Sequence, residues 1–344
     1  MAGITIRDVA KKAGVSTATV SYVLNNSRQV GDGTRERVLT AARQLGYRPN
    51  ITARNLQASE TRLIGYSWRP TPPDRFNPVL DRFLQAIAEA AAHHDYRILA
   101  FPSLDIHEEL SAYEEMMLIG QVDGFILTNT NFDDERVLAL VKNQFPFVSF
   151  GRANEDWDFP WIDVDGAAGT LAAVRHLVSQ GHRRIGFLAW PEVSQTGHYR
   201  MHGFLTGMQE AGLLVDEAWV QLAGNFHDEA YAATQRLLAL PAERRPSAVV
   251  ASSDLMAMGV INAGWDTGLQ VGGDLAVVGF DDAPIACFLR PALTTLAQPI
   301  YDIGERLVSM LLDEINGLSH AERQILLAPS LVVRASSAVP WSDS

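Results

Sequence analysis

The sequence of 344 residues is long enough for two or three domains, and its 47% hydrophobic and 20% charged residues are typical of a globular protein. Its single cysteine, Cys287, excludes a disulfide framework and is expected to be a small buried apolar residue, because no catalytic motif surrounds it. No apolar run approaches the roughly 20 residues that span a bilayer, and the N-terminus does not resemble a signal peptide. These features predict a cytoplasmic protein without a membrane partner.

The formal net charge of −12 is unevenly distributed along the chain. Residues 1–62 contain ten basic and four acidic side chains, a net charge of +6, which leaves −18 for the remainder. A basic N-terminal segment on an acidic body is typical of a DNA-binding module attached to a part that avoids DNA.

The spacing of apolar residues predicts three short helices near the N-terminus, over residues 6–13, 17–24 and about 33–45. Gly14 ends the first helix and Ser16 caps the second. The side chains expected to face the core are Ile6, Val9, Ala10, Ala13, Val20, Val23, Leu24, Val38, Leu39, Ala42 and Leu45.

Two short helices joined by a glycine-containing turn predict a helix-turn-helix. Its second helix would enter the major groove, with Thr17, Ala18 and Tyr22 facing base edges. Ser16, Thr19 and Ser21 suit phosphate contacts. The alternative is a packed three-helix bundle that does not bind DNA.

From residue 62 onward, short apolar strands alternate with helical segments, and the pattern restarts near residue 164. This alternation predicts two similar α/β lobes, each with a parallel sheet covered on both faces. The expected strands cover residues 63–66, 96–100, 124–127, 147–150, 185–188, 219–222, 248–251 and 276–280.

Three segments, residues 5–25, 34–38 and 45–50, resemble the head of the lactose/galactose repressor family of bacterial transcription regulators, and the resemblance continues to about residue 335. It implies a multi-domain fold: an all-α helix-turn-helix head and a two-lobed α/β body similar to periplasmic binding proteins. The implied divisions are a head at 1–48, a hinge at 49–61 and a body at 62–340, with lobe 1 at about 62–162 and 292–324 and lobe 2 at about 163–291 and 325–340.

In that family the linker forms a hinge helix on operator DNA, and a leucine wedges into the minor groove. The matching residue here is Leu56, and Ala53 is small enough for two hinge helices to approach each other. Alternatively, Leu56 is a linker residue that packs on the body. The full set of expected DNA contacts is Thr5, Ser16, Thr17, Ala18, Thr19, Ser21, Tyr22, Asn25, Asn50, Ala53 and Leu56.

The resemblance also implies a small-molecule effector between the lobes, and open α/β sheets bind ligands beyond the carboxyl ends of their strands. Arg200 and Asp281 match family positions that bind the effector, although they could instead form a structural ion pair. The expected effector residues are Phe76, Asn77, Arg152, Arg200, Phe226, Ser253 and Asp281.

Several further residues allow two interpretations. Asp254 is expected to be a helix N-cap, whereas Asp163 and Asp165 could be N-caps or cleft residues. Trp68, Trp161 and Trp190 could stack on a sugar ring or belong to the core or an interface. Ser194 and Gln195 replace a charged pair of the purine-responding members, which favours a neutral saccharide over a purine. The alternative is the same architecture responding to a purine or a sugar phosphate.

The sequence favours a regulator over an enzyme, because it has no nucleophile elbow, phosphate loop, zinc-binding helix or dinucleotide-binding turn. No cofactor or metal is expected. A sugar-binding module without DNA function would lack the basic head. The C-terminal residues show no heptad repeat, which favours a homodimer on palindromic operator DNA.

Overall fold

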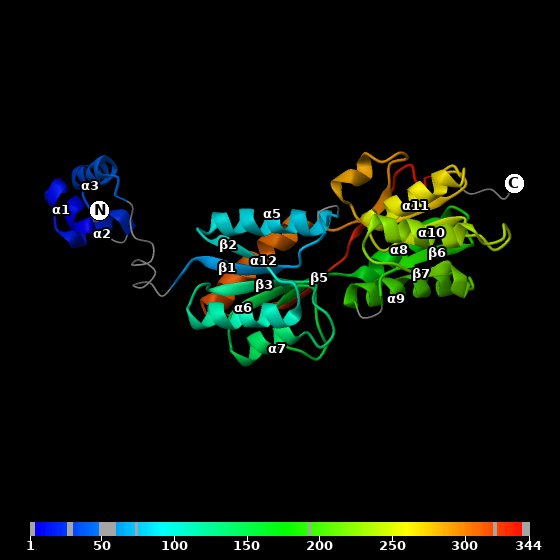
Figure 1. Ribbon diagram of the computed structural model, residues 1–344, viewed down its shortest axis with the longest axis horizontal. Coiled ribbons are helices and arrows are strands. Elements are labelled where there is room, and N and C mark those ends of the chain that lie inside the picture. Colours follow the sequence, from blue (N-terminus) through cyan, green and yellow to red (C-terminus); the bar gives the residue numbers. More distant parts are fainter. Residues whose placement is uncertain are drawn as a thin grey trace. The chain divides into compact units, whose positions relative to one another are not determined.

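The computed structural model describes residues 4–25, 30–47, 60–72, 75–191, 194–318 and 322–338. The chain divides into two compact units, Met1–Thr61 and Arg62–Ser344. Figure 1 labels the elements of both. Among the described residues, no helix has the length and apolar character that crossing a membrane would require.

The first unit contains three helices, α1 (Ile6–Ala13), α2 (Thr17–Asn25) and α3 (Asp32–Leu45). They pack around one apolar cluster, in which Val9, Val20 and Val38 are fully buried. The expectation that Leu39 faces the core is wrong: Leu39 is 36% exposed, and Ala41 is buried. Ala41 takes a core position, because its methyl side chain is small enough to fit where the head helices pack together.

The ends of these helices follow from their cap residues. Gly14 and Gly46, with φ of 66° and 65°, end α1 and α3 in the left-handed region that glycine adopts without strain. The Ser16 hydroxyl accepts a hydrogen bond of 3.1 Å from the Thr19 N–H at the start of α2. The turn between α1 and α2 is therefore set by local chemistry.

The first lobe of the second unit is built on a six-stranded sheet in the order β11-β5-β4-β3-β1-β2, and every pair in it is parallel. Helices α5 and α12 cover one face and α6 and α7 the other (Figure 1). The bounds are β1 Leu63–Trp68, α5 Pro78–His93, β2 Arg97–Pro102, α6 Ile106–Leu118, β3 Gly124–Thr128, α7 Glu135–Lys142, β4 Phe147–Phe150, β5 Trp161–Val164, α12 Ile300–Ile315 and β11 Gln324–Leu327.

The second lobe has a sheet in the order β12-β10-β9-β8-β6-β7, in which only the β10–β12 pair is antiparallel among the described strands. Helices α8 and α9 pack together, as do α10 and α11. The bounds are α8 Gly166–Ser179, β6 Ile185–Ala189, α9 Gln195–Glu210, η1 Glu217–Trp219, β7 Val220–Leu222, α10 His227–Leu238, β8 Ala248–Ala251, α11 Asp254–Asp266, β9 Ala276–Asp281, η2 Pro284–Cys287, β10 Thr294–Ala297 and β12 Ser330–Val332.

The chain crosses between the lobes after β5, after β10 and between β11 and β12. The expected lobe boundary at residues 291 and 292 is therefore wrong, because β10 pairs with β9 in the second sheet, Thr294 opposite Val278. The crossings near residues 162 and 324 likewise move to the carboxyl ends of β5 and β11. The sequence pattern missed β5, β10, β11 and β12, which are short and carry mixed polar and apolar residues.

The expectation for Cys287 is also wrong. The residue is exposed, at the end of the 3-10 helix η2. Its thiol donates a hydrogen bond of 3.2 Å to the Pro284 carbonyl. The short helix turns this side chain outward while Ala286 fills the core position.

Candidate functional site

A cavity of about 310 Å³ lies between the two lobes of the second unit. Its lining residues follow the carboxyl ends of strands from both sheets, where parallel α/β sheets commonly bind ligands. They include Thr128 at the end of β3, Asn129 and Thr130 after it, Gly151 and Arg152 after β4, Asp163 in β5, Trp190 after β6, Asn225 after β7 and Asp281 at the end of β9.

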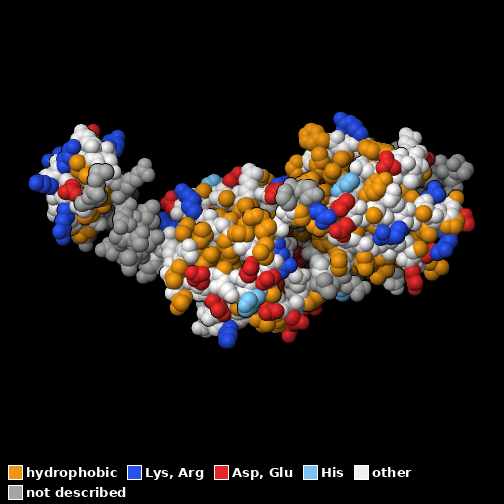
Figure 2. Space-filling model, in the orientation of Figure 1, with side chains coloured by type: hydrophobic (Ala, Val, Ile, Leu, Met, Phe, Trp, Pro, Cys, Tyr) orange, Lys and Arg blue, Asp and Glu red, His pale blue; other side chains and the backbone are white. Residues whose placement is uncertain are grey.

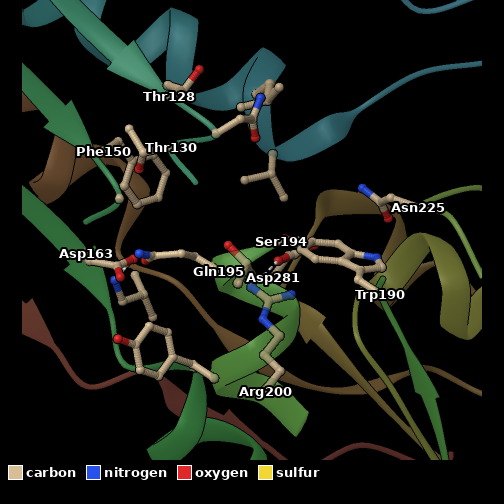
Figure 3. A pocket seen from close by; sticks show the side chains of 18 of the residues that line it. Thr128, Thr130, Phe150, Asp163, Trp190, Ser194, Gln195, Arg200, Asn225 and Asp281 are labelled. Carbon is tan, nitrogen blue, oxygen red and sulfur yellow. Dashed lines mark hydrogen bonds and ion pairs between the residues drawn. The ribbon is translucent and has the colours of Figure 1, made fainter. Parts of the chain in front are cut away.

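Arg200 reaches the cavity from α9 and is only 4% exposed (Figure 3). Its guanidinium carbon lies 3.6 Å from the centroid of the Phe280 ring, and one Nη atom donates to the Ser252 carbonyl. Its other Nη lies 3.8 Å from Oδ1 of Asp281. Burial lowers the pKa of Arg200, and the carboxylate opposes that shift.

Asp281 ends β9 with a φ of 122°, a conformation that non-glycine residues rarely adopt. Its Oδ1 accepts a hydrogen bond of 2.6 Å from Nε2 of Gln298. Burial raises the pKa of Asp281 to about 6, while Arg200 and Gln298 act in the opposite direction. A carboxylate held in this way retains acceptor capacity toward the cavity.

A second ion pair joins Arg152 and Asp163 on the first-lobe side, with Nε 2.9 Å from Oδ2. The Arg152 guanidinium lies 3.8 Å from the centroid of the Tyr199 ring, which comes from α9 of the second lobe. Burial raises the pKa of Asp163, and Arg152 counteracts the shift. The two arginines and two aspartates make this part of the cavity formally neutral.

Three cavity residues have a buried polar atom without a hydrogen-bond partner in the part of the chain that the structure describes. These atoms are Nε of Arg200, Oε1 of Gln195 and Nε1 of Trp190. Gln195 uses its amide nitrogen to donate to the Ala153 carbonyl in the other lobe. Since buried polar groups are costly when unpaired, the cavity suits a ligand that both donates and accepts hydrogen bonds.

Four of the seven expected effector residues line this cavity: Asn77, Arg152, Arg200 and Asp281. Asn77 also caps α5, accepting from the Leu80 N–H at 3.3 Å.

The other three do not line it. Phe76 is 48% exposed, and the ring of Phe226 is covered by the guanidinium of Arg75. Ser253 caps α11 and donates to Oδ1 of Asn225 at 2.6 Å, so that Asn225 occupies the cavity wall in front of it.

The structure also separates the ambiguous aspartates. Asp165 caps α8 by accepting from the Ala168 N–H at 2.8 Å, whereas Asp163 lines the cavity. Asp254 is not an N-cap, because Ser253 has that position. Instead its buried carboxylate accepts from the hydroxyl of Thr295 and the N–H of Ala283, at 2.5 and 2.7 Å, and holds the turn after Asp281.

The tryptophans divide as well. Trp190 lines the cavity, Trp68 lines a neighbouring one, and Trp161 packs against an apolar cluster of the first lobe. Six further cavity residues were not expected from the sequence: Thr128, Asn129, Thr130, Tyr199, Asn225 and Gln298. All but Tyr199 and Gln298 closely follow expected strands, a signal that could have identified them.

In the first unit, Thr17 and Ala18 are exposed at the start of α2, and Tyr22 is half-buried one turn later. Ser16 and Thr19 join their hydroxyls at 2.9 Å, and Ser21 is half-buried. The side chain of Asn25, and the residues Asn50, Ala53 and Leu56, lie outside the described residues.

The hydroxyl and the N–H of Thr5 both donate to the Asp8 carboxylate, at 2.7 and 2.8 Å. The backbone hydrogen bond is the main reason that the pKa of Asp8 is lowered, and the hydroxyl adds to it. Figure 2 shows Lys and Arg side chains predominating over Asp and Glu on the visible face of this unit. A surface on which basic side chains predominate is suited to DNA phosphates.

Two family models match the chain. Residues 5–50 match bacterial regulatory proteins of the lacI family, and residues 174–337 match a periplasmic binding protein-like domain. The HTH-type transcriptional repressor CytR of Escherichia coli (strain K12) is 34% identical over 334 residues, which are 97% of this chain and 96% of the relative.

Solved structures are similar over the same length. The lac repressor dimer bound to operator and the anti-inducer ONPF is 26% identical, with a TM-score of 0.85, over 97% of this chain and 99% of that one. A complex of the transcriptional regulator CelR with cellobiose is 29% identical, with a TM-score of 0.73 and the same coverages.

Proposed function

Because this chain belongs to the lacI family of bacterial regulatory proteins, we propose that it is a cytoplasmic transcriptional repressor that binds a palindromic operator as a homodimer. A neutral saccharide in the cavity between its lobes controls its affinity for that operator. The proposed response to a ligand is supported by the unpaired polar atoms of Trp190, Gln195 and Arg200 around that cavity. No enzymatic role is proposed.

The charge balance favours a neutral ligand. Among the described residues that line this cavity, Arg152 and Arg200 are matched by Asp163 and Asp281, which leaves no surplus cation there for a sugar phosphate. A sugar hydroxyl is both donor and acceptor, and it can therefore satisfy Gln195 and Arg200 together. The cellobiose complex of the relative CelR is consistent with this class.

The cavity can couple to DNA binding because its wall comes from both lobes. Gln195 of the second lobe donates to the Ala153 carbonyl of the first, and Arg82 donates to the Asp282 carbonyl at 2.8 Å. A ligand that prefers one lobe arrangement shifts the equilibrium toward it. The proposed readout is the spacing of two hinge segments, 49–61, in which Leu56 wedges the operator centre.

The head supplies the DNA-binding side of the proposal. Thr17 and Ala18 are exposed where a helix-turn-helix contacts base edges, and Thr5, Ser16 and Thr19 lie near the same end of α2 or at the start of α1. The basic surface around them would make affinity fall steeply with salt concentration.

The experiment has two stages. Operator fragments are first selected from genomic DNA by the purified protein, and affinity is measured by fluorescence anisotropy between 50 and 200 mM salt. Monosaccharides, disaccharides, nucleosides, purines and sugar phosphates are then screened by thermal shift and added to the DNA titration. We expect one neutral saccharide to change operator affinity at least tenfold. Absence of any preferred fragment, with and without these compounds, would refute the repressor function.

A further inference from the structure

A second cavity of about 180 Å³ adjoins the effector cavity. The two share the loop Thr128–Thr130 together with Trp190, Ser194 and Thr196, so that they lie side by side along these residues. Figure 3 shows Thr128 and Thr130 on one side of the first cavity and Ser194 with Trp190 on another. A ligand seated by Arg200 and Asp281 can therefore extend past this loop.

Glu109 of α6 lines the second cavity and is only 2% exposed. Its Oε1 accepts hydrogen bonds from the Ser67 hydroxyl, from Tyr113 at 2.9 Å and from Arg136 at 3.1 Å. No hydrogen bond reaches Oε2 from any residue that the structure describes. The carboxylate is thus fixed by one oxygen and leaves the other as an acceptor.

Arg136 ties this carboxylate to the shared loop. It forms ion pairs with Glu109 and Asp134, at 3.1 and 2.8 Å. It also donates to the carbonyls of Thr128 and Asn129, both at 3.1 Å. With its donors directed to protein groups, Arg136 is poorly placed to bind an anionic ligand, whereas the spare oxygen of Glu109 suits a hydroxyl donor.

Two tryptophans flank the same cavity. Trp68, at the end of β1, is 41% exposed, and Trp190 contributes the wall shared with the first cavity. The other described lining residues are polar or charged, and Arg69 adds a second guanidinium to that of Arg136 beside the Glu109 carboxylate. Aromatic faces beside hydroxyl-binding groups match a saccharide ring, which presents an apolar face and a polar edge.

We propose that Ser67, Trp68 and Glu109 form a second sugar subsite, so that the effector is a disaccharide with one ring in each cavity. This inference rests on the proposed saccharide response. Ligand pockets commonly have volumes of roughly 300–1,000 Å³, and the first cavity alone is at the lower end of that range. The second cavity supplies the additional room and its own hydrogen-bonding anchor.

The test compares cellobiose, maltose and lactose with glucose and galactose by isothermal titration of the full-length protein, its Trp68→Ala and Glu109→Gln variants, and Trp265→Ala. Trp265 is 46% exposed on α11 and does not line either cavity, which makes it a matched control. We expect one disaccharide to bind at least tenfold more tightly than its component sugars. Trp68→Ala should remove that advantage and change monosaccharide affinity less than twofold.

Glu109→Gln should also reduce the preference for the disaccharide, and its cooperative unfolding is checked first. If the Glu109→Gln variant does not unfold cooperatively, the Trp68→Ala variant alone decides the test. Equal affinity for monosaccharide and disaccharide, or an equal loss for both in Trp68→Ala, would overturn the second subsite and leave the saccharide response intact. Tighter binding of a nucleoside, or no binding of any sugar, would overturn the saccharide response itself.

Discussion

The guanidinium carbon of Arg75, in the first lobe, lies 3.8 Å from the centroid of the Phe226 ring in the second. The same side chain approaches Asp228 and Glu229, at 3.0 and 3.6 Å. Neither Arg75 nor Phe226 lines the effector cavity. One arginine therefore joins the lobes without lining the effector cavity, and it can influence lobe closure independently of effector recognition.

Replacing Arg75 by Ala should weaken effector binding about fivefold, because a stacked cation contributes about 1 kcal/mol to the closed arrangement. The measurement is isothermal titration with the saccharide found in the screen. Arg306→Ala is the control, since Arg306 pairs with Asp302 on its own helix. Identical dissociation constants for the two variants would show that the contact does not support closure.

Effector affinity should fall as the pH decreases through about 6, because protonation removes an acceptor oxygen from Asp281. Arg200, Arg82 and Asp254 are the charged groups whose fields act on this carboxyl. Asp281→Asn should bind at least tenfold more weakly and lose the pH dependence between 5 and 7. A parent titration that stays flat over this interval would contradict the prediction.

The raised pKa of Asp281 affects the stability of the ligand-free protein in the opposite direction to its effect on effector affinity. The pKa of Asp281 is higher in the folded state than the ordinary 3.8. Its protonation therefore favours folding below that value, and this contribution is lost as the pH rises through about 6. As the pH falls through about 6, protonation of Asp281 should thus raise the melting temperature of the ligand-free protein and lower its affinity for the effector.

Replacing Tyr22 by Ala should lower affinity for the selected operator about five- to 150-fold, since a specific base contact contributes about 1–3 kcal/mol. Affinity for random DNA should change little, because phosphate contacts dominate it. Competition anisotropy measures both. Leu39→Ala, an exposed apolar truncation on α3, serves as the control. An equal loss of affinity for random DNA would show that Tyr22 does not contribute to base recognition.

Gly203→Ala should destabilise the second unit by about 1–3 kcal/mol, because a Cβ at this position of α9 would collide with the Ala167 carbonyl on α8. Urea unfolding followed by far-ultraviolet circular dichroism, which reports on the helices of both units, measures the loss. Gly33→Ala in α3 is the control, since the added methyl group meets nothing there and favours the helix. Unchanged stability of Gly203→Ala would mean that the two helices can separate without cost.

The head helices could be predicted because their signals are local. Apolar spacing defined α1 and α2, and Gly14 and Ser16 marked their ends. The position of Leu39 could not be decided in this way, because it lies at the edge of the apolar face of α3, and packing against the other head helices buries Val38, Ala41 and Ala42 while leaving Leu39 36% exposed. The strand β10 was missed for a related reason, since pairing with β9 stabilises it.

Some cavity residues could be predicted from the sequence, and others could not. Arg200 and Asp281 were found from their places after strands and from family resemblance, and both line the cavity. Phe226 matched a family position as well, yet Arg75 covers its ring. The sequence carries no sign of that contact, because Arg75 and the α10 residue Asp228 beside Phe226 are separated by 153 positions along the chain.

The basic helix-turn-helix head, the alternation of strands and helices, and the family could be predicted from local patterns, because each depends on residues close together in the chain. The polar groups that meet around the cavities could not, among them the Glu109 carboxylate held by Ser67, Tyr113 and Arg136. Parallel sheets place the ends of distant strands side by side, and the remaining hydrogen-bonding capacity of each group depends on those neighbours.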